Sequence, residues 1–152
     1  MILLTALCSL ITTSLQDYSV CNVYQKVEQL FHCGPSGYPI GYGLKNCLTF
    51  SNRDDLSVFS PIGVEFMNCS TPCLTNAMSA IARDYSQTCD KLRDRAFQSH
   101  FDCYMKCDFC TVCKTEKIAL LRSYYLLDFL SMDAVKQVYQ IATTCGIWSC
   151  LW

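Results

Sequence analysis

The sequence has little charge, and neither sign of charge dominates. Charged residues make up 16% of the 152 residues and the formal net charge is −1, whereas average soluble domains carry about 25% charged residues. Nucleic-acid binding needs a basic surface that neutralises phosphates, so we expect no nucleic-acid partner. The chain also lacks low-complexity tracts, charge runs and repeats of solenoid length, which favours one ordinary domain.

Cysteine, by contrast, is abundant. The chain contains 13 cysteines, a density close to that of disulfide scaffolds. In a reducing compartment most of these side chains would remain free thiols unless they bound metal. The composition therefore predicts a secreted protein in an oxidising, extracellular environment.

The first residues predict a secretory signal peptide over residues 1–14. The segment has no charged side chain and an apolar run over residues 2–11, which is too short to span a bilayer as a mature helix. Thr12 and Ser14 provide small side chains at the −3 and −1 positions of the expected cleavage site. An uncleaved anchor is the alternative.

Cleavage after Ser14 removes Cys8 and leaves twelve cysteines, an even number that fits complete pairing. No later segment reaches membrane-spanning length without charge. We therefore expect residues 15–152 to form a single cysteine-rich domain with no membrane span.

Helical periodicity dominates this domain and predicts an all-α, disulfide-stapled fold of about five helices. Apolar stripes, caps and breakers predict helices that begin near Val20, Pro61, Asp90, Thr115 and Ser131. Residues 34–43 hold four of the six glycines and two of the four prolines, which predicts an irregular loop. Pro72 either kinks one long helix or begins a second one, because proline lacks the amide donor.

One cysteine motif has a spacing suited to metal or redox chemistry. Cys107, Cys110 and Cys113 follow a Cys-x-x-Cys-x-x-Cys pattern, which is typical of zinc sites and of redox dithiols. An oxidising compartment argues against both, so structural disulfides are the favoured interpretation. Full pairing likewise argues against a cysteine nucleophile activated by His32 or His100.

The segment from Ser99 to Tyr104 is similar to the His-Asp-x-Cys-Tyr helix of secreted phospholipases A2, and residues 33–37 resemble their glycine-rich calcium loop. The resemblance implies a general-base histidine, His100, beside a calcium-binding aspartate, Asp102. Here Phe101 separates the two. On a helix this extra residue rotates the carboxylate by about 100° from the position that it has when it directly follows the histidine. A calcium-dependent lipase is therefore the alternative function.

Asn68-Cys69-Ser70 matches the N-glycosylation sequon, which predicts a glycan acceptor at Asn68 in a secreted chain. Because Cys69 is also expected to form a disulfide within a helix, glycan transfer would have to precede folding.

A wider pattern runs over residues 59–145. Phe59, Gly63 and Phe66 precede a ladder of five cysteines, the third of which is followed by tyrosine: Cys73, Cys89, Cys103, Cys110 and Cys145. This arrangement resembles the stanniocalcin family. The Cys-Gly-Pro-x-Gly-Tyr segment that begins at Cys33 is more similar to secreted cysteine-rich invertebrate relatives than to the vertebrate hormones.

Stanniocalcins are secreted, helical, disulfide-linked glycoprotein hormones associated with calcium and phosphate balance and with inhibition of pappalysin metalloproteinases. The resemblance thus implies a non-enzymatic signalling or inhibitory protein whose partner is an extracellular receptor or protease, without a cofactor or metal. The sequence ends at Trp152, before the family's region with the interchain cysteine. A homodimer is an alternative, but it would not be linked through that cysteine.

The resemblance also implies the pairs Cys73–Cys103 and Cys110–Cys145, and a link from Cys89 to an amino-terminal cysteine, chosen as Cys33. Given these pairs, Cys69 and Cys107 would also come within bridging distance if the two helices are antiparallel. Cys69 lies one turn before Cys73 and Cys107 lies one turn after Cys103, on the helix faces that meet. Elimination leaves Cys21–Cys47 and Cys113–Cys150. If Pro72 breaks its helix, Cys69 pairs elsewhere.

Overall fold

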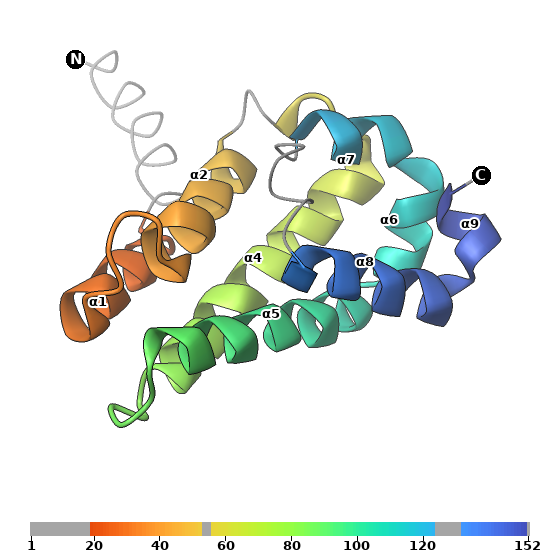
Figure 1. The fold of residues 1–152 in the computed structure, drawn as a ribbon. Coiled ribbons are helices and arrows are strands. Elements are labelled where there is room, and N and C mark those ends of the chain that lie inside the picture. Colours follow the sequence, from red (N-terminus) through yellow and green to blue (C-terminus); the bar gives the residue numbers. More distant parts are fainter. Residues whose placement is uncertain (1–18, 53–55, 124–131, 152) are drawn as a thin grey trace, which may run out of the picture.

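The structure is a computed structural model that describes residues 19–52, 56–123 and 132–151. All regular elements in this part of the chain are helical, which confirms the all-α prediction (Figure 1). In chain order they are α1 (Asn22–Phe31), the π-helix η1 (Tyr38–Leu44), α2 (Lys45–Ser51), α4 (Pro61–Ile81), α5 (Cys89–Lys106), α6 (Phe109–Thr115), α7 (Lys117–Ser123), α8 (Met132–Cys145) and α9 (Ile147–Leu151). None of the helices in these ranges is long and apolar enough to cross a membrane.

The described residues form more helices than the five or so that the sequence predicted. Several segments expected as loops or as parts of longer helices are separate short helices. Only α1, α4, α5 and α8 have ten or more residues among the described elements. Short helices such as α2 and α9 have too few residues for a clear apolar period, so tertiary contacts decide their conformation.

The centre of the fold is the pair of helices α4 and α5. Two disulfides, Cys69–Cys107 and Cys73–Cys103, connect them in antiparallel order. Pro72 lies inside α4 and does not end it, so one long helix forms and Pro72 does not begin a second one. The long helix supplies buried side chains to both halves of the molecule.

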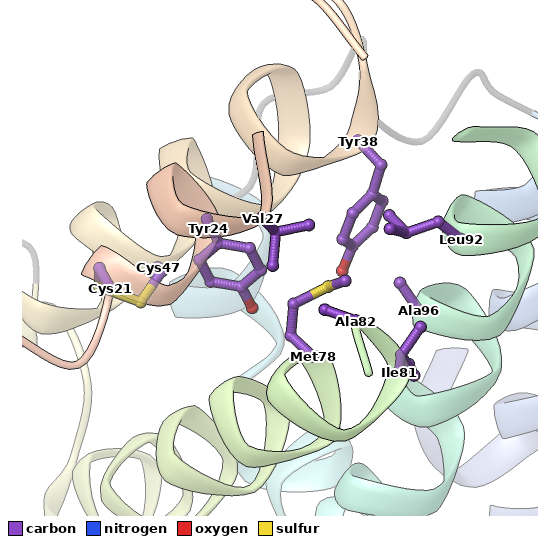
Figure 2. Packing of buried hydrophobic residues seen from close by; sticks show 10 residues of the cluster. All are labelled: Cys21, Tyr24, Val27, Tyr38, Cys47, Met78, Ile81, Ala82, Leu92 and Ala96. Atoms are coloured by element: carbon purple, nitrogen blue, oxygen red, sulfur yellow. A yellow bond between two sulfur atoms is a disulfide. The ribbon is translucent and has the colours of Figure 1, made fainter. Parts of the chain in front are cut away.

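An amino-terminal layer of α1, η1 and α2 packs on one end of this pair. Figure 2 shows the shared core, in which buried side chains of α1 and η1 meet those of α4 and α5. The cluster consists of Cys21, Tyr24, Val27, Tyr38, Cys47, Met78, Ile81, Ala82, Leu92 and Ala96. Full burial of each large apolar side chain in such a core contributes about 1.5–3 kcal/mol.

The carboxyl-terminal helices build a second core on the other end of the pair. Its buried members come from both helices of the pair and from neighbouring segments: Phe59, Phe66, Met67, Tyr104, Cys107, Val112, Ala119 and Ile141. The rings of Phe66, Tyr104 and Phe109 lie 5.1–5.4 Å apart between centroids, which is a favourable distance for aromatic pairs.

The predicted irregular loop over residues 34–43 is wrong in its second half, where η1 forms a π-helix. The first half does end α1: His32 and Gly34 adopt positive φ angles of 51° and 84°, a conformation that glycine adopts without strain. In η1, Gly43 approaches Tyr24 so closely that a Cβ atom at this position would overlap the ring.

Two predicted helix boundaries also need correction. Helix α5 begins at Cys89, not after Asp90, because the Thr88 side chain accepts a hydrogen bond from the Lys91 amide and is the N-cap. The helix predicted to begin near Thr115 begins at Lys117, because α6 ends at Thr115 and Glu116 interrupts the two helices. Ser131, the predicted cap of α8, lies outside the described residues.

Candidate functional site

The two bridges between α4 and α5 form a covalent seam. The Cα atoms are 5.8 Å apart in Cys69–Cys107 and 5.7 Å apart in Cys73–Cys103, within the usual range for disulfides. On each helix the two cysteines are four residues apart and therefore on the same face. The seam fixes both the register and the direction of the central helix pair.

Two further bridges attach the amino-terminal layer. Cys21–Cys47 joins the start of α1 to α2, with a Cα separation of 5.8 Å. Cys33–Cys89 joins the turn after α1 to the first residue of α5, with a Cα separation of 5.6 Å. The layer is thereby closed on itself and tied to the central pair.

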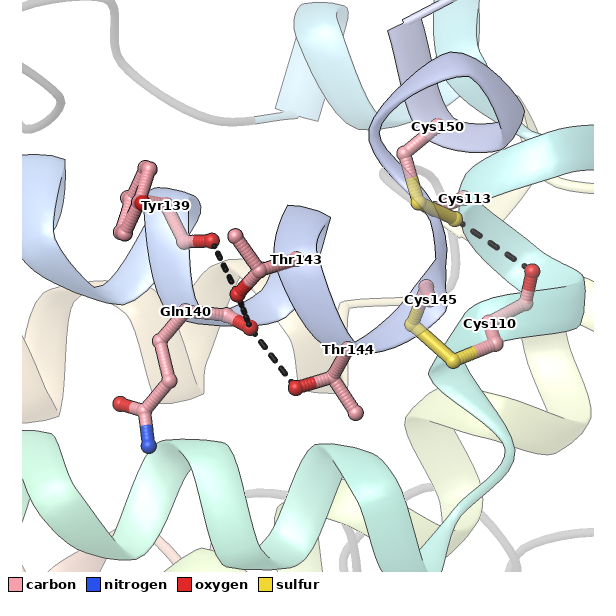
Figure 3. Close-up of a disulfide and its surroundings, with 8 residues drawn as sticks. All are labelled: Cys110, Cys113, Tyr139, Gln140, Thr143, Thr144, Cys145 and Cys150. Carbon is pink, nitrogen blue, oxygen red and sulfur yellow. Dashed lines mark hydrogen bonds between the residues drawn. A yellow bond between two sulfur atoms is a disulfide. The ribbon is translucent and has the colours of Figure 1, made fainter.

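The last two bridges hold the carboxyl-terminal helices, and Figure 3 shows them side by side. Cys110–Cys145 links α6 to the end of α8, and Cys113–Cys150 links α6 to α9. The sulfur atoms of Cys113, Cys145 and Cys150 all lie within 4.8 Å of one another. Each is bonded in a disulfide, and a disulfide sulfur is not the thiolate that zinc requires.

The structure thus places all twelve cysteines from Cys21 to Cys150 in six pairs. These are the six pairs considered in the sequence analysis. The three cysteines of the Cys-x-x-Cys-x-x-Cys motif go to three different partners, so the structure does not gather them into one metal or dithiol site.

His100 lies in a buried aromatic cluster on α5. Its Nε2 atom is 2.8 Å from the hydroxyl of Tyr38, and its ring centroid is 5.6–5.7 Å from those of Tyr42, Phe97 and Tyr104. Burial lowers the pKa of His100 to about 4, because the charged imidazolium would lose its hydration. The side chain is therefore neutral at pH 7. Burial likewise raises the pKa of Tyr38 well above its usual value.

The structure does not bring His100 and Asp102 together. His100 is 4% exposed, whereas Asp102 lies on the solvent-exposed side of α5. Two residues along an α-helix rotate a side chain by about 200°, so the two point in opposite directions. The geometry of a histidine beside a calcium-binding carboxylate, which the lipase alternative requires, is not formed by these residues.

His32, the other histidine considered for catalysis, is exposed and caps α1. No cysteine among the described residues is left as a thiol beside it or beside His100. The pairing with cysteine that nucleophilic catalysis needs is therefore not present at either position.

The sequon lies on the surface of α4. Asn68 is exposed, its neighbour Cys69 is in the seam, and the Ser70 side chain is 2% exposed. The asparagine of the folded chain is open to solvent, but the serine that completes the motif is not. Glycosylation at Asn68 stays a prediction.

Sequence reasoning missed two buried polar residues that organise the fold. Glu116 accepts hydrogen bonds from the Ser60 amide, at 3.1 Å, and from the Ser60 hydroxyl, and so binds the first turn of α4. Tyr38 meets His100 across 62 positions of sequence. No local motif indicates either contact, because each partner is distant along the chain.

Comparisons with known proteins find similarity to one kind of curated protein. The chain is 22% identical to stanniocalcin-2 of Rattus norvegicus over 100 residues, which is 66% of this chain and 33% of the relative. It is 23% identical to stanniocalcin-2 of Pongo abelii over 135 residues, or 80% of this chain and 45% of the relative. The chain thus spans less than half the length of these relatives. No protein-family profile and no solved structure matches it.

Proposed function

We propose that this protein is a secreted, non-enzymatic, stanniocalcin-like factor that acts by binding an extracellular protein. The observation that carries the proposal is the similarity to stanniocalcin-2, which covers most of this chain. The helical fold with six disulfides fits such a factor. A receptor or a pappalysin-type metalloproteinase is the partner that the family resemblance implies, in hormone-like or inhibitory action connected with calcium and phosphate balance.

Secretion is the first part to test. The full 152-residue chain is expressed in animal cells, and the medium is analysed by intact mass spectrometry before and after reduction. We expect a product that begins at Leu15 and is about 12 Da lighter than its reduced form, because each of six bridges removes two hydrogens. Retention in the membrane fraction, or several free thiols, would contradict this part of the proposal.

Protein binding is the second part. The oxidised secreted protein is added to a pappalysin cleavage assay, and its direct binding to the protease is measured by surface plasmon resonance. Inhibition with saturable binding supports the inhibitory form of the proposal. Absence of both, at protein concentrations that saturate stanniocalcin-2 in the same assay, would refute that form.

The lipase alternative is tested on phospholipid vesicles with and without calcium. We expect no calcium-dependent hydrolysis from the secreted protein. Asp102→Asn is the informative variant because the side chain is exposed, so its replacement leaves the core intact. Robust hydrolysis that Asp102→Asn abolishes would overturn the non-enzymatic proposal.

A further inference from the structure

A small cavity lies between the amino-terminal layer and the central helix pair. Its volume is about 30 Å³. Aromatic and aliphatic side chains form most of its wall, among them Tyr42, Phe50, Phe66 and Tyr104. No charged side chain of the described residues lines it, so nothing in the wall would compensate the charge of an ionic ligand.

Three buried polar residues line this cavity: His100 from α5, Asn46 from α2 and Ser70 from α4. The first two are 4% and 7% exposed. The Nδ1 atom of His100 and the Oδ1 atom of Asn46 are buried and have no hydrogen-bond partner among the described residues. Each is therefore a polar group that the described part of the chain leaves unsatisfied.

The other polar atom of each side chain is already engaged, which fixes the orientation of both. Tyr38 occupies the Nε2 side of the His100 ring at 2.8 Å and does not line the cavity. Asn46 Nδ2 donates to the carbonyl oxygen of Tyr42 at 2.9 Å. The unsatisfied Nδ1 and Oδ1 atoms are consequently the polar atoms that His100 and Asn46 can offer to the cavity.

The energetics favour occupation of such a cavity. A buried polar atom without a partner costs about 1–3 kcal/mol, and over 90% of buried polar groups in native proteins are satisfied by protein or ordered water. A water molecule needs about 10–15 Å³ of this kind of volume together with polar partners. The cavity is thus large enough for one water and has room for a second, but it is too small for an organic ligand.

We propose that this cavity is a binding site for ordered water, which hydrogen-bonds to His100 Nδ1 and to Asn46 Oδ1 and so links α5 to α2. In this arrangement the Tyr38 hydroxyl donates to His100 Nε2, and the proton of the neutral imidazole is on Nδ1. The Nδ1–H group donates to the water, and the water donates to Asn46 Oδ1. Water supplies the acceptor and the donor that these two atoms need.

The first test uses the unmodified oxidised protein at pH 7. Proton and nitrogen NMR of the histidine side chains should show a proton on Nδ1 of His100 and negative cross-relaxation from that proton to a signal at the water frequency. A proton on Nδ1 that instead couples through a hydrogen bond directly to the Asn46 side chain, or a proton without cross-relaxation to water, would overturn the proposal.

The second test counts long-lived water molecules by oxygen-17 magnetic relaxation dispersion. Asn46→Leu replaces the amide by an apolar group of similar shape, and the dispersion amplitude should fall by the contribution of at least one water. Asn76→Leu is the matched control, because Asn76 is exposed on α4 and should leave the amplitude unchanged. Equal amplitudes in Asn46→Leu and the unmodified protein would refute the site, and if Asn46→Leu does not fold, the cross-relaxation measurement alone decides.

Discussion

Acidification should destabilise this protein through His100. In the folded chain, burial lowers the pKa of this histidine from 6.5 to about 4, whereas the unfolded chain retains the ordinary value. Between these two pH values the unfolded state binds one more proton than the folded state, so the free energy of unfolding falls as the pH falls. The contribution of neutral His100 is fully present above pH 6.5 and is lost by about pH 4. A difference of this size corresponds to about 3 kcal/mol.

The measurement is denaturant unfolding of the oxidised protein at several pH values between 7.5 and 4. The chain has two histidines, which provides a matched pair of variants. His100→Gln should be less stable at pH 7 and should lose the histidine part of the pH dependence, while the exposed His32→Gln should keep it. Carboxylates contribute to acid unfolding in all three proteins, so the difference between the variants isolates the histidine term.

Two results would refute this reasoning. The first is an unchanged pH dependence in His100→Gln. The second is an NMR titration of the unmodified protein in which His100 titrates near 6.5, a measurement that stays informative even if His100→Gln does not fold.

Three other perturbations follow from the bridges and the buried contacts. Replacing either bridge of the α4/α5 seam by two alanines should cost about 2–3 kcal/mol in denaturant unfolding, and replacing both should cost more than the sum, because each bridge limits the loop that the other would close; strictly independent losses would contradict the seam. Glu116→Ala should cost about 1–3 kcal/mol because the Ser60 amide and hydroxyl lose the buried acceptor that Glu116 provides. The exposed Glu65→Ala should have little effect, and equal thermal unfolding of the two variants would refute the role of Glu116. Gly43→Ala should cost about 1–3 kcal/mol because its Cβ would overlap Tyr24, and a melting temperature equal to that of the unmodified protein would show that the ring moves aside freely.

The helix content could be predicted from the sequence because apolar spacing and helix caps are local signals. The face of α1 that buries Tyr24 and Val27 was predictable from its period, and so was the end of α1 near Gly34. The four-residue spacing from Cys69 to Cys73 and from Cys103 to Cys107 similarly predicts two neighbouring bridges, once the two helices are taken as antiparallel.

The remaining features depend on contacts that no local window contains. The π-helix η1 contains Gly43, which lies against Tyr24 of α1. The interruption at Glu116 coincides with a carboxylate that binds Ser60, 56 positions earlier. His100 resembled a catalytic residue because its neighbours in sequence are those of a known motif. Its partner Tyr38 is in another part of the chain, and that partner gives the histidine a structural environment.

The arrangement of the bridges has a consequence for proteolysis. The turn between α4 and α5 is exposed, and its Tyr85 side chain is 72% accessible to solvent, so it offers a protease an obvious place to cut. Three bridges, Cys33–Cys89, Cys69–Cys107 and Cys73–Cys103, connect the two sides of such a cut. A chain nicked there keeps the mass of an intact molecule, plus one water, and separates into two fragments only when it is reduced.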